Sequence, residues 1–304
     1  GMGKEVGPVT GKVGIIGAGV VGTAVGVILH RQGWEITGVY DVRPESTAHL
    51  AAKVGARRAG SPTEVARSAD VVFVTTSDSA IQEVVSVVGR EGGFRPGQVV
   101  VHMSGALSSA VLGAARDAGA IVLSVHPLQS FASVERAVSN LPGSVFSIEG
   151  DERGYEDARR IVEALGGEYF FISAAAKPLY HAAACVVSNY LVTVIDLGLG
   201  LMEAAGIPRR QALKAVLPLV QGTVANIAAV GIPAALTGPI ARGDAATVQT
   251  HLAAMQDLYP QALPLYALLG EHTAQVAEAK GTIDAQMRRH LQELLRGVRE
   301  RSQG

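Results

Sequence analysis

The stretch KVGIIGAGVVGTAVGVIL, residues 12–29, decides the fold. A short apolar segment leads into a glycine-rich turn, and a helix-forming run follows it. Gly17, Gly19 and Gly22 have the spacing G-x-G-x-x-G. In this motif the first glycine permits a tight turn, the second lets the backbone approach a pyrophosphate, and the third lets helix and strand pack closely. The helix N-terminus adds free N–H groups and a positive dipole end. The stretch therefore predicts a dinucleotide-binding strand, turn and helix, with Val20 and Val21 in the site.

A second expected strand, residues 34–41, supplies the context that a glycine motif needs. It ends in Asp41, 24 residues beyond Gly17, where a carboxylate can accept hydrogen bonds from both ribose hydroxyls. The same carboxylate would repel a 2′-phosphate, which favours NAD over NADP. Arg43 leaves NADP open, because a guanidinium there could stack on the adenine or meet that phosphate.

Three more apolar runs, residues 69–78, 98–106 and 120–130, alternate with helical patterns. This alternation predicts a doubly wound parallel α/β sheet, in which ligands bind beyond the carboxyl ends of the strands. Polar or small residues stand at the C-terminal end of each of these three runs. They are Thr75, Thr76, Ser77 and Asp78 in the first, His102, Ser104 and Gly105 in the second, and His126, Gln129 and Ser130 in the third. We expect Thr76, Ser77 and Asp78 to face the cofactor, with Ser77 and Asp78 also starting the next helix.

The pattern changes in the second half of the chain. Two further strands are expected within residues 143–151 and 168–173, and only helical patterns follow. We therefore predict an NAD(P)-binding Rossmann domain over residues 1–172 and an all-helical substrate and dimerisation domain over 173–304. The expected helices are 178–205, 209–229, 245–257, 260–279 and 283–300, with Asp244 and Thr282 as N-caps.

The stretch AAAKPLYHAAACVVSNYL, residues 174–191, is an apolar helical pattern that contains polar residues whose burial costs free energy. Helical spacing puts Lys177, His181 and Ser188 on one stripe with Asn189 at its edge. Because this helix directly follows the nucleotide-binding domain, its start is expected to face the nicotinamide. The alternative is structural: Lys177 on the surface, His181 hydrogen-bonded in the core, and Asn189 tying two helices together.

Composition excludes several function classes. The formal net charge is −1 and there is no long basic block, so neither nucleic acid nor an anionic membrane is an expected partner. The single cysteine, Cys185, fits a reducing cytosol, and no secretory signal is apparent, so a cytoplasmic protein is expected. The uncharged runs 178–195 and 215–241 are expected to be buried in a soluble domain, because polar residues, prolines and glycines interrupt them. No histidine or acidic spacing predicts a metal site.

Five segments of the chain resemble a known family. The segments GAGVVG, VHMSGA, SVHPLQSF, KPLYHAAACVVSNY and LTGPIARGD resemble proteins that join a Rossmann-like domain to the domain of unknown function 2520. These lie within the superfamily of β-hydroxyacid and 6-phosphogluconate dehydrogenases, and pyrroline-carboxylate and ketopantoate reductases are similar. The resemblance implies an NAD(P)-dependent dehydrogenase or reductase with a 6-phosphogluconate dehydrogenase-like C-terminal domain. Lys177 matches the lysine that moves the proton, whereas His181 stands where those dehydrogenases have an asparagine.

We therefore expect hydride transfer to or from a small polar substrate that bears a carboxylate. The candidate catalytic residues are Lys177, His181, His126, Ser104 and Asn189. The candidate substrate ligands are Gly105, Gln129, Ser130 and Arg242, the last either a surface arginine or a carboxylate clamp. The alternative function is a non-catalytic NAD(P) sensor. Apolar helices also predict a homodimer with its interface between residues 178 and 280.

Overall fold

The computed structural model describes residues 11–304 and has two compact units, the first ending at Ser188 and the second running from Asn189 to Gly304. This division lies later than the domain boundary expected after residue 172. It does so because Lys177, the first residue of helix α8 (Lys177–Val187), is buried among strand ends of unit 1.

Unit 1 is built on one eight-stranded sheet in the order β3-β2-β1-β4-β5-β6-β7-β8. The strands are β1 Lys12–Ile16, β2 Glu35–Tyr40, β3 Arg57–Arg58, β4 Val71–Val74, β5 Val99–His102, β6 Ile121–Pro127, β7 Val145–Gly150 and β8 Glu168–Phe171. The predicted α/β sheet is confirmed, and its neighbouring strands are parallel except for β6 and β7, which are antiparallel. The chain between these two contains only a seven-residue helix, about 10 Å long, too short to carry it back along β6 for a parallel crossover.

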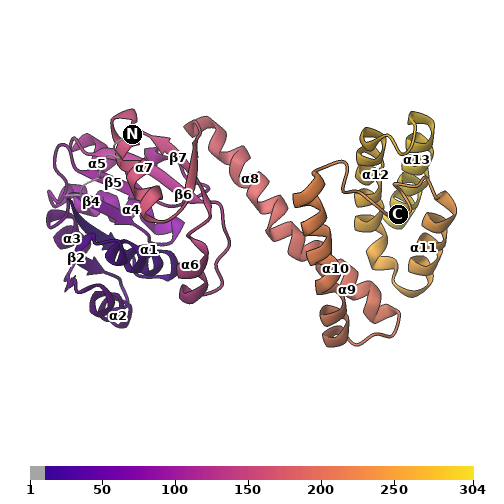
Figure 1. The fold of residues 1–304 in the computed structure, drawn as a ribbon, viewed down its shortest axis with the longest axis horizontal. Helices are drawn as coiled ribbons and strands as arrows, with labels where there is room; N and C mark the ends of the chain where they lie inside the picture. The colour runs from indigo at the N-terminus through magenta and orange to yellow at the C-terminus, as the bar shows by residue number, and fades with distance from the viewer. Residues whose placement is uncertain (1–10) are drawn as a thin grey trace, which may run out of the picture. The chain divides into compact units, whose positions relative to one another are not determined.

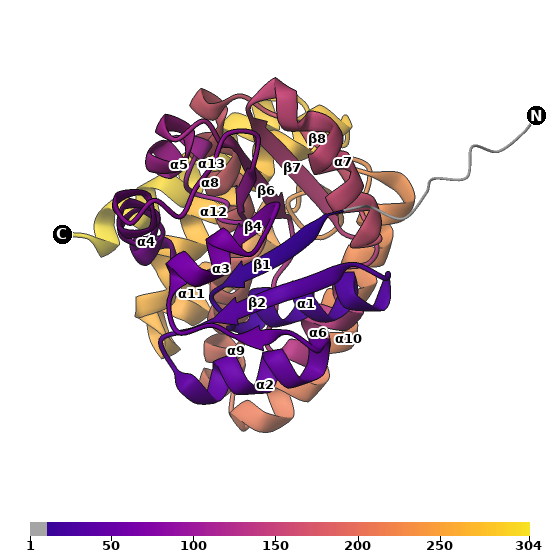
Figure 2. The ribbon, with the colours of Figure 1, turned by 90° about the vertical axis from the view of Figure 1, so that its left-hand side faces the viewer.

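Helices cover both faces of this sheet (Figure 2). One face packs against α1 (Val20–Arg31), α2 (Pro44–Val54), α6 (Val134–Asn140) and α7 (Tyr155–Ala164). The other packs against α3 (Pro62–Arg67), α4 (Asp78–Arg90) and α5 (Gly113–Asp117). Strands buried on both faces read as continuous apolar runs, as in the fully buried VVFV of β4. In such strands the polar residues are found mainly where the strand ends.

Unit 2 is helical throughout (Figure 1). Its helices are α9 Asn189–Ala204, α10 Arg209–Val230, α11 Ala245–Leu258, α12 Leu263–Lys280 and α13 Ala285–Ser302. Helices α11, α12 and α13 share one core, and α9 packs on α10 around Leu199, Ala212 and Val216. The expected cap at Asp244 is confirmed, since its carboxylate accepts the Thr247 N–H at 3.1 Å.

Two expectations about the helices are wrong. Thr282 does not cap α13; Asp284 does, because its carboxylate accepts the Met287 N–H at 2.8 Å. The helix expected over 178–205 is broken at Ser188, where φ is −112° and ψ is −69°. As a result, Ser188 leaves the stripe that was expected to carry Lys177 and His181, and it is exposed.

The apolar helices of the middle of the chain are not buried within it. The stretches Ala174–Ala204 and Arg209–Val230 are long and apolar enough to cross a membrane, and only 6% of the most apolar window of each is buried. Leu179, Val192 and Leu219 are 79%, 69% and 69% exposed. The expectation that these runs are buried in a soluble domain is therefore wrong for the single chain. Helix α10 ends before Gly231, so the run 215–241 is not one helix, as predicted.

Candidate functional site

The glycine loop between β1 and α1 has the shape that a dinucleotide needs. Gly17 has a φ of +104°, which strains any side chain. A Cβ at Gly22 would lie 1.9 Å from the carbonyl oxygen of Gly17 and 2.5 Å from Thr75 Oγ1. A Cβ at Gly19 would meet no atom within 4 Å, and no side chain caps the helix there. The first turn of α1 therefore faces open space with its amides available to a phosphate, so these residues fit the cofactor.

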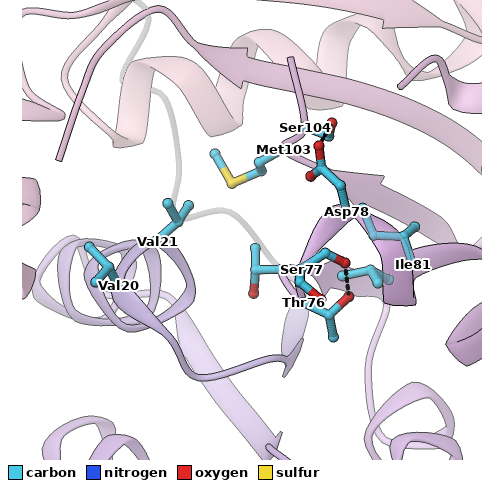
Figure 3. Close-up of a pocket in the computed structure, with 10 residues that line it drawn as sticks. Val20, Val21, Thr76, Ser77, Asp78, Ile81, Met103 and Ser104 are labelled. Atoms are coloured by element: carbon cyan, nitrogen blue, oxygen red, sulfur yellow. Dashed lines mark hydrogen bonds between the residues drawn. The ribbon is translucent and has the colours of Figure 1, made fainter. Parts of the chain in front are cut away.

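A cavity of about 240 Å³ opens beside this loop (Figure 3). Its walls come from the first turn of α1, the end of β4 with the start of α4, and the residues after β5. The lining residues are Val20, Val21, Val74, Thr75, Thr76, Ser77, Asp78, Ile81, Met103 and Ser104. The fold thus brings together the cofactor residues predicted at the α1 and β4 positions and one predicted catalytic residue, Ser104.

Asp41 ties the glycine loop to the end of β2. Its carboxylate accepts the Ala18 N–H at 2.7 Å through Oδ2 and the Arg43 N–H at 2.9 Å through Oδ1. Each oxygen keeps a lone pair for a ribose hydroxyl. Arg43 exposes its side chain, and so does Arg58 of β3, whose backbone pairs with Val39. The sequence interpretation did not include Arg58, because a two-residue strand has no visible pattern.

Ser104 closes the other end of the cavity. Its hydroxyl donates to Asp78 Oδ2 at 2.9 Å and accepts the Ala106 and Leu107 N–H groups at 3.2 Å each (Figure 3 shows the bond to Asp78). The turn after β5 is therefore held by its own serine. A substrate oxygen that accepts a hydrogen bond from Ser104 would have to compete with Asp78.

Lys177 lies behind Ser104 and is 1% exposed. Its Nζ donates to the Ser104 carbonyl oxygen at 3.0 Å and to Ser124 Oγ. Burial lowers its pKa from 10.5 to about 8, although the charges of Glu149 and Asp78 act in the opposite direction. The alternative that placed this lysine on the surface does not hold.

Four polar residues form one face of the antiparallel pair β6–β7. Ser124 and His126 alternate along β6, and their cross-strand partners are Glu149 and Ser147. Glu149 is buried and accepts both the N–H and the hydroxyl of Ser109, at 2.7 and 2.9 Å. Of these four residues the sequence predicted only His126. The signal that could have found the others is the period-two polar spacing in LSVHP and VFSIEG.

His126 is the centre of a cluster at the end of β6. Its Nδ1 lies 2.8 Å from the hydroxyl of Tyr180. Its opposite edge meets Gly105, where a Cβ would lie 2.8 Å from His126 Nε2 and 3.0 Å from His181 Cδ2. Burial, together with the nearby charges of Lys177 and His181, lowers the pKa of His126 to about 4. The imidazole is therefore neutral at pH 7.

His102 supports the same turn from inside. It is fully buried, its Nδ1 accepts the Ser104 N–H at 3.1 Å, and its Nε2 faces the Ser108 carbonyl oxygen at 2.9 Å. A ring that accepts at Nδ1 and donates at Nε2 is a neutral imidazole, and burial lowers its pKa to about 4. We assign His102 a structural role in shaping residues 102–108.

The remaining candidates lie outside this cluster or on the other unit. Gln129 and Ser130 are exposed after β6, and Gln129 Oε1 accepts the Ser130 N–H at 3.0 Å. In unit 2, Asn189 opens α9 and Arg242 precedes α11, and both are exposed. Across residues 11–304, no group of three or more His, Cys, Asp or Glu side chains is placed to hold a metal ion.

Comparison with known families agrees with this arrangement. A Rossmann-like domain matches residues 3–127, and the Domain of unknown function (DUF2520) matches residues 144–273. The chain belongs to the family that joins these two domains. The second match begins inside the sheet, just before β7, so the family's second region includes the polar face of that strand as well as the helices.

Similar proteins share the fold. A protein of Bacteroides fragilis, provisionally described as an NADP oxidoreductase, superposes with a TM-score of 0.64 and 24% identity over 95% of this chain and 98% of its own. The imine reductase of Myxococcus stipitatus, solved with NADP⁺, gives a TM-score of 0.61 and 19% identity over 92% and 99%. The human cytokine-like nuclear factor N-PAC is 28% identical over 72% of this chain. The chain spans about two fifths of the length of that relative, with 39% of it covered. This chain therefore has the fold of NAD(P)-binding oxidoreductases.

Proposed function

We propose that the protein is an NAD(P)-dependent oxidoreductase acting on a small polar substrate that bears a carboxylate. The observation that carries this proposal is the cavity that runs from Val20 and Val21, in the first turn of α1, to Ser104, with Lys177 directly behind Ser104. When bound, the nicotinamide ring supplies or accepts the hydride. The solved relatives with NADP⁺ and, for a variant, NAD⁺ support a nicotinamide cofactor here.

Different residues of the chain would bind different parts of the dinucleotide. The loop at Gly17, Gly19 and Gly22 and the first turn of α1 would hold the pyrophosphate. Asp41 would accept ribose hydroxyls, with NAD favoured on that ground, and Arg43 keeps NADP open. The apolar side chains of Val21, Ile81 and Met103 line the cavity and would keep water from the nicotinamide.

Proton transfer is assigned to Lys177, supported by His126. With a pKa near 8, Lys177 is protonated at pH 7 and can still release its proton near neutrality, as a general acid requires. His126 is neutral and presents the Nε2 edge beside Gly105 and His181. Ser104, His181 and Asn189 are proposed as further members of the catalytic set. Gly105, Gln129, Ser130 and Arg242 are proposed to bind substrate, Arg242 as a bidentate clamp on the carboxylate.

We also propose that the protein is a cytoplasmic homodimer without nucleic-acid or membrane partners. The exposed apolar residues of α9 and α10 support a second copy as their cover. The net charge of −1 supports the absence of a polyanionic partner.

A thermal-shift panel tests the proposal, with NAD and NADP run separately and followed by small carboxylates with each cofactor. We expect one nicotinamide dinucleotide to raise the Tm and at least one carboxylate to raise it further. Turnover is then read from nicotinamide absorbance. Lys177→Ala should lower kcat by roughly 10²- to 10⁴-fold with little change in cofactor affinity. Arg242→Lys should raise KM for the carboxylate. Failure of both dinucleotides to bind would overturn the proposal.

A non-catalytic NAD(P) sensor is the second candidate. One observation favours it. Lys177 donates both of its described hydrogen bonds to protein atoms, of Ser104 and Ser124, and its side chain is fully buried. In addition, the relative N-PAC is named a nuclear factor and not an enzyme. Tight dinucleotide binding without turnover of any substrate, in the wild type and in Lys177→Ala alike, would favour the sensor.

A further inference from the structure

Tyr180 contacts His126 on the side of the imidazole ring opposite Gly105. It lies three residues after Lys177 in α8, so the two side chains project from the same side of the helix. The Tyr180 hydroxyl lies 2.8 Å from His126 Nδ1, and the two rings meet edge to face at 88° with centroids 5.6 Å apart. Phe170 of β8 packs against the phenol at 5.9 Å and 67°. The phenol is therefore fixed by contacts with both an imidazole and an aromatic ring.

Behind this pair lies a buried hydroxyl without a hydrogen bond. Ser147 is 1% exposed, and its backbone pairs with that of His126 across the β6–β7 ladder. Within residues 11–304 its Oγ has no hydrogen-bond partner. Buried hydroxyls are rarely left unpaired, so this one calls for an explanation. Tyr180 is a polar neighbour of this hydroxyl: burial raises the pKa of the phenol, and Ser147 acts in the opposite direction.

The other edge of the imidazole faces the glycine after β5. Its Cε1 and Nε2 occupy the space that a side chain at Gly105 would need, each 2.8 Å from the ideal Cβ position, and His181 Cδ2 is at 3.0 Å. The ring thus has one nitrogen on the phenol and the other at the strand end, where α/β sheets bind ligands.

We propose that Tyr180 is a positioning residue: its O–H donates to Nδ1 and fixes His126 as the neutral Nε2–H tautomer, which donates to a carbonyl or carboxylate oxygen of the substrate. The tautomer follows from residues of this chain alone. Only the identity of the acceptor rests on the proposed function, because an oxidoreductase substrate with a carboxylate supplies such an oxygen.

The direction of the hydrogen bonds follows from counting donors. If the phenol donates to Nδ1, its single hydrogen is used and Nε2 carries the hydrogen of the neutral ring. In the reverse arrangement Nδ1–H donates to the phenol oxygen, and the phenol hydrogen has no hydrogen-bond acceptor among the described residues. A doubly protonated ring is disfavoured by burial and by Lys177, His181 and His102, with Asp78 alone opposing them.

The tautomer can be measured without any substrate. Long-range ¹H–¹⁵N NMR of the full-length protein labelled with [¹⁵N]histidine distinguishes a protonated from an unprotonated ring nitrogen, and His126→Gln identifies the relevant signals. We expect Nε2 protonated and Nδ1 unprotonated between pH 6 and 8. In Tyr180→Phe, which keeps the ring and loses the hydroxyl, we expect a mixture of tautomers. Tyr169→Phe, the same change on the edge strand β8, is the matched control and should leave the signals unchanged.

Two results would overturn the positioning role: a protonated Nδ1 in the wild type, or the same tautomer in Tyr180→Phe as in the wild type. Dinucleotide affinity, measured on the same samples, should be equal in all variants. If the wild type does not bind a dinucleotide, the proposed function is wrong, but the tautomer measurement still tests the positioning role of Tyr180. With an active substrate, Tyr180→Phe should lower kcat about tenfold at unchanged KM for the cofactor. An unchanged kcat would show that His126 Nε2–H does not donate a hydrogen bond to the substrate.

Discussion

The ammonium of Lys177 donates a 3.0 Å hydrogen bond to the carbonyl oxygen of Ser104, a residue 73 positions earlier in the chain. This bond joins the first turn of α8 to the turn that ends β5, and the second bond of Lys177, to Ser124, adds β6. One side chain therefore connects three elements that carry proposed catalytic residues: α8, the turn after β5, and β6. A buried ammonium without a direct carboxylate partner is costly, and that cost is reflected in its lowered pKa.

Lys177 should make stability depend on pH above 8. Its pKa is about 8 in the folded protein and 10.5 as the ordinary value, so between these values the unfolded chain binds more protons. The free energy of unfolding therefore rises with pH across this window, by up to roughly 3 kcal/mol for this group. Urea denaturation from pH 7.5 to 10.5 should show this rise in the wild type and a smaller one in Lys177→Met. Lys53→Met, at an exposed lysine of α2, is the control. Parallel profiles for wild type and Lys177→Met would refute the prediction.

Gly19→Val should abolish dinucleotide binding while the protein stays folded. A Cβ at this position meets no protein atom within 4 Å, so the new side chain would project into the open space beside the first turn of α1. Calorimetry with NAD and NADP gives the affinity, and the thermal transition checks the fold. We expect a Tm close to that of the wild type. Wild-type affinity in this variant would show that the pyrophosphate does not lie at the loop.

Cofactor preference should respond to two neighbouring residues in opposite ways. Asp41→Ala removes the proposed ribose acceptor and the 2.7 Å bond from the Ala18 N–H, so both cofactors should bind more weakly, NAD more than NADP. Arg43→Ala should weaken NADP more than NAD, since contact of the guanidinium with a 2′-phosphate acts on NADP only, whereas stacking on the adenine acts on both cofactors. The measurement is Kd for each cofactor in each variant. If NADP binds the wild type at least tenfold more tightly than NAD, Arg43 and not Asp41 sets the preference.

The parts of this site that sequence predicts are those set by local pattern. The G-x-G-x-x-G spacing and the buried VVFV strand depend on neighbours along the chain, so the sequence predicts both. The pairing of Ser147 with His126 could not be predicted, because it depends on the antiparallel register of β6 and β7. Tyr180 has the pattern of an ordinary helix residue, and its contact with His126 depends on how α8 packs beside β6. The burial of Lys177 could not be predicted either, since a lysine at the start of a helix can equally well be exposed to solvent.

Gly105→Ala should disturb His126 without affecting the cofactor cavity. An added methyl group would lie 2.8 Å from His126 Nε2, closer than real contacts allow, and 3.0 Å from His181 Cδ2, so the His126 imidazole must shift. Gly105 does not line the cavity beside the glycine loop, so dinucleotide affinity should stay the same. The His126 NMR signals should move, and kcat for any substrate should fall at least tenfold. Unchanged signals would mean that His126 does not press against this turn.

The last prediction concerns the exposed helices α9 and α10. Val192 and Leu219 are each 69% exposed, and such large apolar side chains are normally covered by a partner surface or by lipid. The 31-residue stretch Ala174–Ala204 includes Lys177, whose side chain is buried in unit 1, so it cannot lie in a bilayer along its full length. This favours a second copy as the cover. Light scattering in detergent-free buffer at micromolar concentration should give a homodimer, and Val192→Asp combined with Leu219→Asp should give a monomer, because two buried carboxylates would be left unpaired. Val42→Asp, at an 82% exposed residue of unit 1, should remain dimeric. A wild-type monomer, or recovery of the protein with the membrane fraction, would contradict the dimer.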